Sequence, residues 1–197
     1  ASLSDLHQAA KRLSDFEGSP ERQKAITSAD AWCAAFTQPK NAETEQAAVT
    51  DEVVRALTDG TGVHPGTLAL VHAEATQHRF FHWHLEFPQI FDSGESASQQ
   101  GWSGGFTVMI GNPPWERVKL QEKEYFNDVP EIAAAPNAAV RKRLIKALPD
   151  IDPSLWDAWQ RASRRAESTS HFLRLSGRYP LTAAGDVNTY QVFAETA

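Results

Sequence analysis

The stretch Gly104-Gly105-Phe106-Thr107-Val108-Met109-Ile110-Gly111-Asn112-Pro113-Pro114-Trp115 has the most distinctive pattern in this chain of 197 residues. Its apolar run at 106–110 contains β-branched residues and lies between glycines, which is typical of a buried strand that enters a turn. Each proline fixes its own φ and keeps the preceding residue out of the α region. The stretch therefore predicts a strand followed by a rigid, extended loop at 112–115.

The predicted loop presents hydrogen-bond acceptors beside an aromatic plane. Proline has no N–H, so the backbone at Pro113 and Pro114 offers carbonyl groups, while Asn112 adds a side-chain amide and Trp115 a large flat ring. Two acceptors beside such a ring can bind a planar group that carries an NH2. The alternative for the same residues is a purely structural proline turn with a buried tryptophan.

Asn112, Pro113, Pro114 and Trp115 match, position by position, motif IV of the amino-methyltransferases that use S-adenosylmethionine, whose consensus is Asn/Asp/Ser-Pro-Pro-Tyr/Phe/Trp. The resemblance implies that these four residues are catalytic. Asn112 Oδ1 and the Pro113 carbonyl would accept both hydrogens of an adenine amine, which makes the nitrogen lone pair more available for methylation. Trp115 would stack on a base that has left the duplex.

Two further segments resemble the same enzymes. The aromatic stretch 79–91 is similar to one that precedes motif IV in large bacterial restriction-modification and phage-defence adenine methyltransferases, where it packs rather than binds metal. The segment 185–195 resembles the start of motif V, which has an Asn/Asp-x-Tyr-x-x-Phe pattern and helps to line the pocket between cofactor and base. The matching positions, our candidates for substrate binding, are Asp186, Asn188, Tyr190 and Phe193.

Two other patterns resemble functional sites, one a metal site and one a cofactor-binding loop. His82, His84 and Glu86 would share one face of an extended chain, but no fourth ligand with suitable spacing follows, so no metal is predicted. The glycine-containing segment 59–66 follows a predicted helix rather than a strand, and Pro65 breaks the glycine spacing of a cofactor loop.

On this resemblance the chain lacks the glycine-rich loop and the acidic residue with which a complete methyltransferase domain binds its cofactor. Thr107 also replaces an Asp that is common before the motif IV strand. We therefore expect an internal fragment that is inactive alone, with S-adenosylmethionine bound by the full-length enzyme. The predicted fold class is mainly α with a small β component, an incomplete piece of a Rossmann-like α/β methyltransferase domain with a helical insertion.

Hydrophobic spacing and capping residues predict most of the remaining elements. The predicted helices cover 2–17, 20–37, 51–57, 67–79, 116–127, 137–148 and 153–176. Asp152 and Pro153 are expected to start the last of these helices, and the three-residue spacing of Trp156 and Trp159 favours a core position over a stacking platform. The first two are expected to form an antiparallel hairpin, and the polar segment 92–103 to form a mobile loop. The predicted regions are an N-terminal helical region (1–66), a segment leading to the motif IV strand and loop (67–115), a locally basic helical insertion (116–184) and the start of the motif V helix (185–197).

Composition and charge limit the classes of protein to which the chain can belong. The chain is 41% hydrophobic and 22% charged, which is ordinary for a soluble globular protein. No run is long enough to span a membrane, and the single Cys33 excludes internal disulfides, so we expect a cytoplasmic protein. The net charge is −6, yet residues 139–178 carry nine Lys and Arg against four Asp and Glu. This segment either meets phosphates or forms the solvated faces of two helices.

The leading hypothesis is a fragment of an N6-adenine DNA methyltransferase. Its partners would be double-stranded DNA with a flipped adenine and the remainder of the methyltransferase chain, with no membrane. One alternative is a fragment of a protein glutamine-amide methyltransferase, because an Asn-Pro-Pro-Tyr motif also serves that chemistry. Another is a non-catalytic helical module that positions DNA or mediates an interaction.

Overall fold

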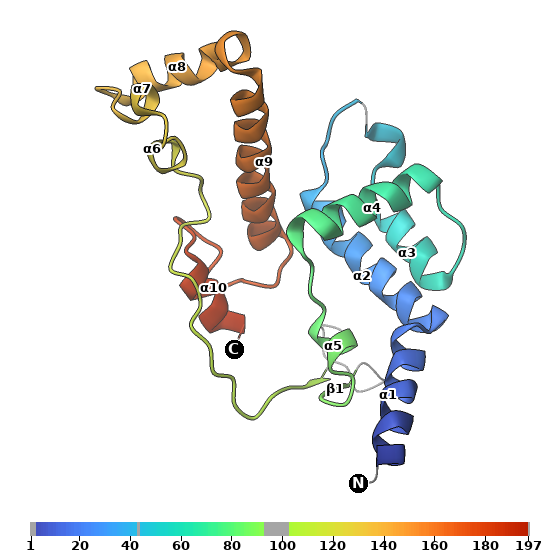
Figure 1. Ribbon diagram of the computed structural model, residues 1–197. Helices are drawn as coiled ribbons and strands as arrows, with labels where there is room; N and C mark the ends of the chain where they lie inside the picture. Colours follow the sequence, from blue (N-terminus) through green and yellow to red (C-terminus); the bar gives the residue numbers. More distant parts are fainter. Residues whose placement is uncertain (1–2, 43, 93–102, 197) are drawn as a thin grey trace. The chain divides into compact units, whose positions relative to one another are not determined.

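The computed structural model describes residues 3–42, 44–92 and 103–196 (Figure 1). This part of the chain is mainly helical, with one two-stranded sheet, which confirms the predicted dominance of helix. The chain divides into two compact units, Ala1–Met109 and Ile110–Ala197, and each is described by itself.

Unit 1 is built from helices whose starts are set by capping residues. They are α1 (Leu3–Glu17), α2 (Pro20–Thr37), the short 3-10 helix η1 (Glu45–Ala47), α3 (Asp51–Asp59), α4 (Pro65–His78) and α5 (Trp83–Glu86). Ser19 accepts a hydrogen bond from the N–H of Arg22, and Thr50 accepts one from the N–H of Val53. Such caps satisfy N–H groups that a helix leaves free at its first turn.

The core of unit 1 lies where α2 packs against α3 and α4. Ala31 and Ala34 of α2, Val71 of α4 and Val49 of the intervening loop are buried. Small side chains on α2 let the other helices approach it closely, and the branched residues of α3 fill the remaining space. The predicted helices at 20–37, 51–57 and 67–79 are confirmed within one or two residues at their ends.

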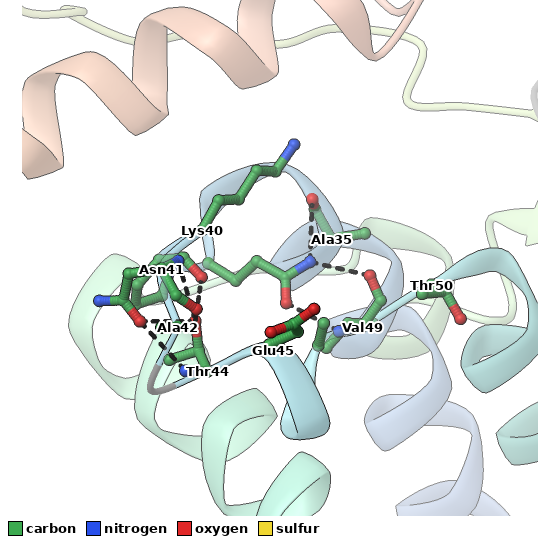
Figure 2. A pocket seen from close by; sticks show the side chains of 11 residues that line it. Ala35, Lys40, Asn41, Ala42, Thr44, Glu45, Val49 and Thr50 are labelled. Carbon is green, nitrogen blue, oxygen red and sulfur yellow. Dashed lines mark hydrogen bonds between the residues drawn. The ribbon is translucent and has the colours of Figure 1, made fainter.

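The side chain of Gln38 bridges the loop between α2 and α3 through two hydrogen bonds to Val49, which we call the Gln38 staple. The amide of Gln38 donates to the carbonyl of Val49 at 2.8 Å and accepts from the Val49 N–H at 2.7 Å, and only 8% of Gln38 is exposed. Gln38 lines a pocket of about 640 Å³. Figure 2 shows this pocket, with Ala35 and Val49 among the residues around it. The staple satisfies the backbone of a loop that has no strand partner.

The predicted hairpin between the first two helices is wrong. Leu3, Leu6, Leu13 and Phe16 of α1 are each 46–73% exposed. Helix α1 contacts the beginning of α2, where Gln23 donates to the carbonyl of Glu17 (Figure 1). The physical reason is that α2 already buries its apolar face against α3 and α4, which leaves no apolar face for α1 to cover.

The aromatic stretch packs, as the resemblance implied, and it does so around Phe106. The Phe106 ring lies 5.2–5.8 Å from the rings of Trp83, Phe87 and Phe91. Strands β1 (Phe91–Asp92) and β2 (Ser103–Gly104) pair antiparallel, with Phe91 opposite Gly104. The predicted mobile loop falls, for residues 93–102, outside the described residues.

The candidate metal residues of this stretch bind protein groups. His82 lies 2.8 Å from the Asp30 carboxylate of α2, and Glu86 forms a 2.9 Å ion pair with Arg22. Across residues 3–42, 44–92 and 103–196, no three His, Cys, Asp or Glu side chains gather as a metal site. These two contacts fasten α5 to α2.

The predicted buried strand at 106–110 is wrong. Residues 105–110 form no strand, and Val108 and Ile110 are 70% and 93% exposed. A strand needs a neighbour to pair its N–H and C=O groups, and no other strand lies beside this run in the described chain. Its apolar, β-branched composition alone therefore does not produce a strand here.

Unit 2 contains α6 (Glu122–Tyr125), α7 (Pro130–Ala133), α8 (Ala138–Ile151), α9 (Pro153–Leu175) and α10 (Thr189–Thr196). Its core gathers Phe126, Ile132, Ile145 and Leu148, with Trp156 and Trp159 packed against them. The two tryptophans are therefore core residues, the interpretation that their three-residue spacing favoured.

Three predicted boundaries in unit 2 have informative outcomes. Helix α9 starts after Asp152, which caps it by accepting from the N–H of Leu155 at 3.0 Å, as predicted. Helix α8 continues through Pro149 to Ile151, so the predicted stop is wrong. Because Pro149 has no N–H, the last turn of the helix lacks one backbone hydrogen bond. Of the predicted helix 116–127 only α6 forms, because residues 116–118 pair with residues 187–189.

No helix among the described residues is long and apolar enough to cross a membrane.

Candidate active site

The Asn-Pro-Pro-Trp loop lies beside the start of α10, within unit 2. Arg117 and Asn188 form an isolated antiparallel bridge, in which the Val118 N–H donates to the Val187 carbonyl at 3.2 Å. The Thr189 N–H donates to the Glu116 carbonyl at 2.9 Å. This short pairing brings together the two ends of the segment that contains helices α6 to α9, and the buried Val187 packs beneath it.

Thr189 adds side-chain contacts to this pairing. Its hydroxyl donates to the carbonyl of Pro114 in a short hydrogen bond and accepts from the N–H of Glu116 at 3.0 Å. Thr189 was not among the predicted site residues, because it occupies an unspecified position of the motif V pattern. The available signal was a hydroxyl residue at the start of a predicted helix, since such residues are frequent caps.

Trp115 and Tyr190 are brought into ring contact. Their centroids lie 5.4 Å apart with an angle of 30° between the planes. Trp115 is 78% exposed and Tyr190 40% exposed, so each ring keeps area open to solvent. The two tilted rings form an exposed aromatic surface, and its Trp115 directly follows Asn112, Pro113 and Pro114 in the chain.

The other candidate residues lie around this surface in different roles. Asn112 is exposed, and Phe193 lies on α10 three residues after Tyr190 and is 50% exposed. Asn188 Oδ1 accepts from the N–H of Tyr190 at 3.4 Å, which caps the start of α10. Asp186 pairs with Arg117 at 3.5 Å, where both side chains are more than 60% exposed. Such an exposed pair stabilises little.

The turn that precedes Asp186 is anchored from both sides. Arg174, near the end of α9, donates to the carbonyls of Ala183 and Gly185 at 3.2 and 2.6 Å. The Glu195 carboxylate of α10 accepts from the N–H groups of Leu181 and Thr182 at 2.9 and 3.0 Å and from the Thr182 hydroxyl.

These anchors also lower the pKa of Glu195. Desolvation acts to raise the pKa of the Glu195 carboxyl, but the Thr182 hydroxyl and the N–H groups of Leu181 and Thr182 outweigh it and hold the pKa below its ordinary value. The ionised carboxylate therefore ties the turn to α10 at neutral pH.

Helices α8 and α9 carry much of the positive charge of unit 2. Besides Arg174, which binds backbone carbonyls, their exposed cations are Lys142, Arg143 and Lys146 on α8 and Arg161, Arg164 and Arg165 on α9. In the part of the chain that the structure describes, none of these six pairs with a carboxylate. Helix α8 has no acidic residue before Asp150, so its exposed face is the more strongly positive.

The glycine-containing segment 59–66 is a helix-to-helix connection. Gly60 ends α3 with φ at 80°, and His64 caps α4 by accepting from the N–H of Gly66. A Cβ on Gly60 would lie 2.8 Å from Nζ of Lys24, so a protein side chain already fills the space there. As the sequence predicted, the residues before this segment form a helix.

Comparison with known proteins gives a family match. The model of the Eco57I restriction-modification methylase family matches residues 20–138, a range that includes the Asn-Pro-Pro-Trp loop. No curated protein matches the chain, and no solved structure matches it. Since the match covers more than half of the 197 residues, the chain belongs to the Eco57I family of restriction-modification methylases.

Proposed function

We propose that this chain forms the base-holding part of a DNA methyltransferase that transfers a methyl group from S-adenosylmethionine to N6 of adenine. The family match supports methyl transfer within a restriction-modification system. The observation that carries the finer proposal is the apposition of Trp115 and Tyr190 directly after the acceptors of Asn112 and Pro113.

The chemistry of the reaction requires acceptors at the amine. The lone pair of an exocyclic adenine nitrogen is conjugated into the ring, which makes it a weak nucleophile. Asn112 Oδ1 and the Pro113 carbonyl accept the two N6 hydrogens and keep electron density on the nitrogen. Trp115 offers a ring face on which the extrahelical base stacks, since the amine is inaccessible inside a duplex. Pro114 restricts Pro113 to an extended conformation, which limits the directions that the Pro113 carbonyl can take.

Tyr190 and its neighbours form the second side of the proposed base site. The Tyr190 ring supports Trp115, and Phe193 extends the apolar surface along α10. Asn188 caps the start of this helix, and Asp186 pairs with Arg117 just before it. Their proposed role is to shape the pocket in which the base is received.

S-adenosylmethionine would supply the methyl group. The glycine-containing segment 59–66 has some likeness to a cofactor loop but does not fit this group, because it joins the end of α3 to the start of α4 instead of following a strand. We therefore assign cofactor binding to the remainder of the methyltransferase chain and expect the 197-residue chain to be inactive alone. Calorimetry with S-adenosylmethionine tests this assignment, and micromolar binding to the isolated chain would overturn it.

Double-stranded DNA is the proposed substrate. The unpaired cations of α8 and α9 favour a polyanion, because Lys and Arg that neutralise phosphates release counterions and strengthen binding. A protein glutamine amide could use the same two acceptors, but the basic helices give no reason to prefer a polypeptide.

The deciding experiment supplies the complete enzyme with isotope-labelled S-adenosylmethionine and either duplex DNA or a mixture of polypeptides. The proposal predicts label in DNA, recovered as N6-methyladenine after digestion to nucleosides. Label recovered as methylglutamine, or no label in DNA, would contradict it.

A further inference from the structure

We propose that Thr189 is the positioning residue that holds the Asn-Pro-Pro-Trp loop in the orientation needed to receive a base. The inference rests on the proposed function, because it assigns to Thr189 a part in the same site. It concerns a residue that lies outside the loop in sequence and contacts no reacting atom.

The hydrogen bonds around Thr189 have one consistent assignment. A hydroxyl carries one hydrogen, and two carbonyls lie near it, Pro114 in the shorter contact and Glu116 at 3.1 Å. The Glu116 carbonyl already accepts from the Thr189 N–H at 2.9 Å. The hydroxyl hydrogen therefore goes to Pro114, and the hydroxyl oxygen accepts from the Glu116 N–H.

The prolines make this single anchor effective along the loop. Each proline fixes φ near −65°, and each restricts the residue before it to extended conformations. Fixing the direction of the Pro114 carbonyl therefore also limits the directions available to the Pro113 carbonyl and Asn112. Without the anchor the loop would turn as a nearly rigid piece about the bonds that follow it.

Packing within the described chain does not replace the anchor. Asn112, Trp115 and the preceding Ile110 are exposed, so no buried side chain of the loop holds it in place. Thr189 is also the residue immediately before Tyr190, so the same contact brings the Tyr190 ring to Trp115. Its hydroxyl thus links the acceptors and the aromatic surface.

Three variants isolate the hydroxyl. Thr189→Val keeps the shape of the side chain and removes both hydrogen bonds, whereas Thr189→Ser keeps the hydroxyl and removes only a methyl group. Thr196→Val is the matched control, because the Thr196 hydroxyl donates to the Val192 carbonyl at 2.8 Å within the same helix and away from the loop.

The first measurement uses the 197-residue chain labelled with 5-fluorotryptophan. The fluorine NMR signal of Trp115 is assigned by its loss in Trp115→Phe. We expect Thr189→Val to shift or broaden this signal, while Thr189→Ser and Thr196→Val leave it in place. An unchanged Trp115 signal in Thr189→Val would overturn the inference.

The second measurement uses the complete enzyme and separates kcat from KM. Thr189→Val should lower kcat for methyl transfer about 10- to 100-fold, because a lost hydrogen bond and a displaced acceptor both act on the reacting geometry. KM for DNA should change by less than about threefold, because phosphate contacts dominate DNA affinity. Thr189→Ser should restore most of kcat.

The outcomes separate this inference from the proposed function. If Asn112→Ala loses methyl transfer while Thr189→Val keeps the parental kcat, the role of Thr189 is wrong and the proposed function stands. If Thr189→Ser loses as much activity as Thr189→Val, the hydroxyl is not the cause and the inference is wrong. Retained methyl transfer in Asn112→Ala would overturn the proposed function, and with it any catalytic role of Thr189.

Discussion

The rings of Trp115 and Tyr190 lie with their centroids 5.4 Å apart and their planes inclined by 30°. Helices α6 to α9 separate the two residues along the chain, yet the pairing of residues 116–118 with 187–189 brings them together. The contact joins the Asn-Pro-Pro-Trp loop and the start of α10 in one exposed surface.

If this aromatic pair holds an extrahelical base, removing the Tyr190 ring should weaken the hold. An aromatic pair stabilises by about 0.5–1.5 kcal/mol beyond its burial. In the complete enzyme, Tyr190→Ala should therefore weaken binding to duplexes with a mismatched, easily displaced target base by about two- to tenfold, whereas Tyr190→Phe should bind like the parent. Fluorescence titration gives both affinities. Equal affinities for Tyr190→Ala and Tyr190→Phe would contradict the role of the ring.

The anchoring of the turn by Glu195 should depend on pH. Because the folded pKa of this carboxyl lies below the unfolded value, its contribution to stability is complete above the unfolded pKa, near 4.5, and is lost as the pH falls through the folded pKa. Glu195→Gln should therefore make unfolding less dependent on pH below about 4.5. Thermal unfolding between neutral pH and pH 3 measures this.

Glu167→Gln removes an exposed carboxylate from α9 and is the control for the change in net charge. If Glu195→Gln and Glu167→Gln have the same acid dependence as each other, the hydrogen bonds of Glu195 do not produce the effect.

The exposed cations of α8 should contribute to DNA affinity. Lys142→Glu combined with Lys146→Glu should weaken duplex binding by the complete enzyme at least about tenfold and lower the salt slope of log K by about two, one for each phosphate contact. Lys11→Glu with Arg12→Glu makes the same charge change on the exposed α1. Equal losses in the two double variants would indicate a general charge effect rather than binding by α8.

The Gln38 staple should be important for the stability of unit 1. Gln38→Ala leaves the buried N–H and C=O of Val49 without partners, at a cost of about 1–3 kcal/mol for each group. We expect the free energy of unfolding in urea to fall by about 2–4 kcal/mol and the Val49 amide to exchange faster in NMR. Gln77→Ala, an exposed change on α4, should alter neither. Persistent protection of Val49 in Gln38→Ala would contradict this role.

Local sequence signals were sufficient for the elements that depend on neighbouring residues. Thr50, and Asp152 with Pro153, marked the starts of α3 and α9, because a cap acts within one turn of its own helix. The spacing of the tryptophans on α9 likewise indicated a core face, and Trp156 and Trp159 pack there.

Most of the wrong predictions depended on distant partners; the exception is the predicted stop before Pro149, a local signal, because α8 continues to Ile151. The run 106–110 has the composition of a strand but no neighbour with which to pair, and residues 116–118 pair with 187–189 instead of continuing a helix. Helix α1 has an apolar stripe, but the apolar face of α2 packs against α3 and α4 instead of against α1. Thr189 was missed for the same reason, since its hydroxyl matters only through the fold that brings Pro114 to it.

The central claim is that Asn112 holds the amine of a target adenine. It is tested most directly by measuring methyl transfer to duplex DNA and S-adenosylmethionine binding in Asn112→Ala of the complete enzyme, with Asn127→Ala, an exposed change outside the loop, as the control. We expect Asn112→Ala to lose methyl transfer and keep the parental affinity for the cofactor, and the control to remain active. Methyl transfer at the parental rate in Asn112→Ala would contradict the claim.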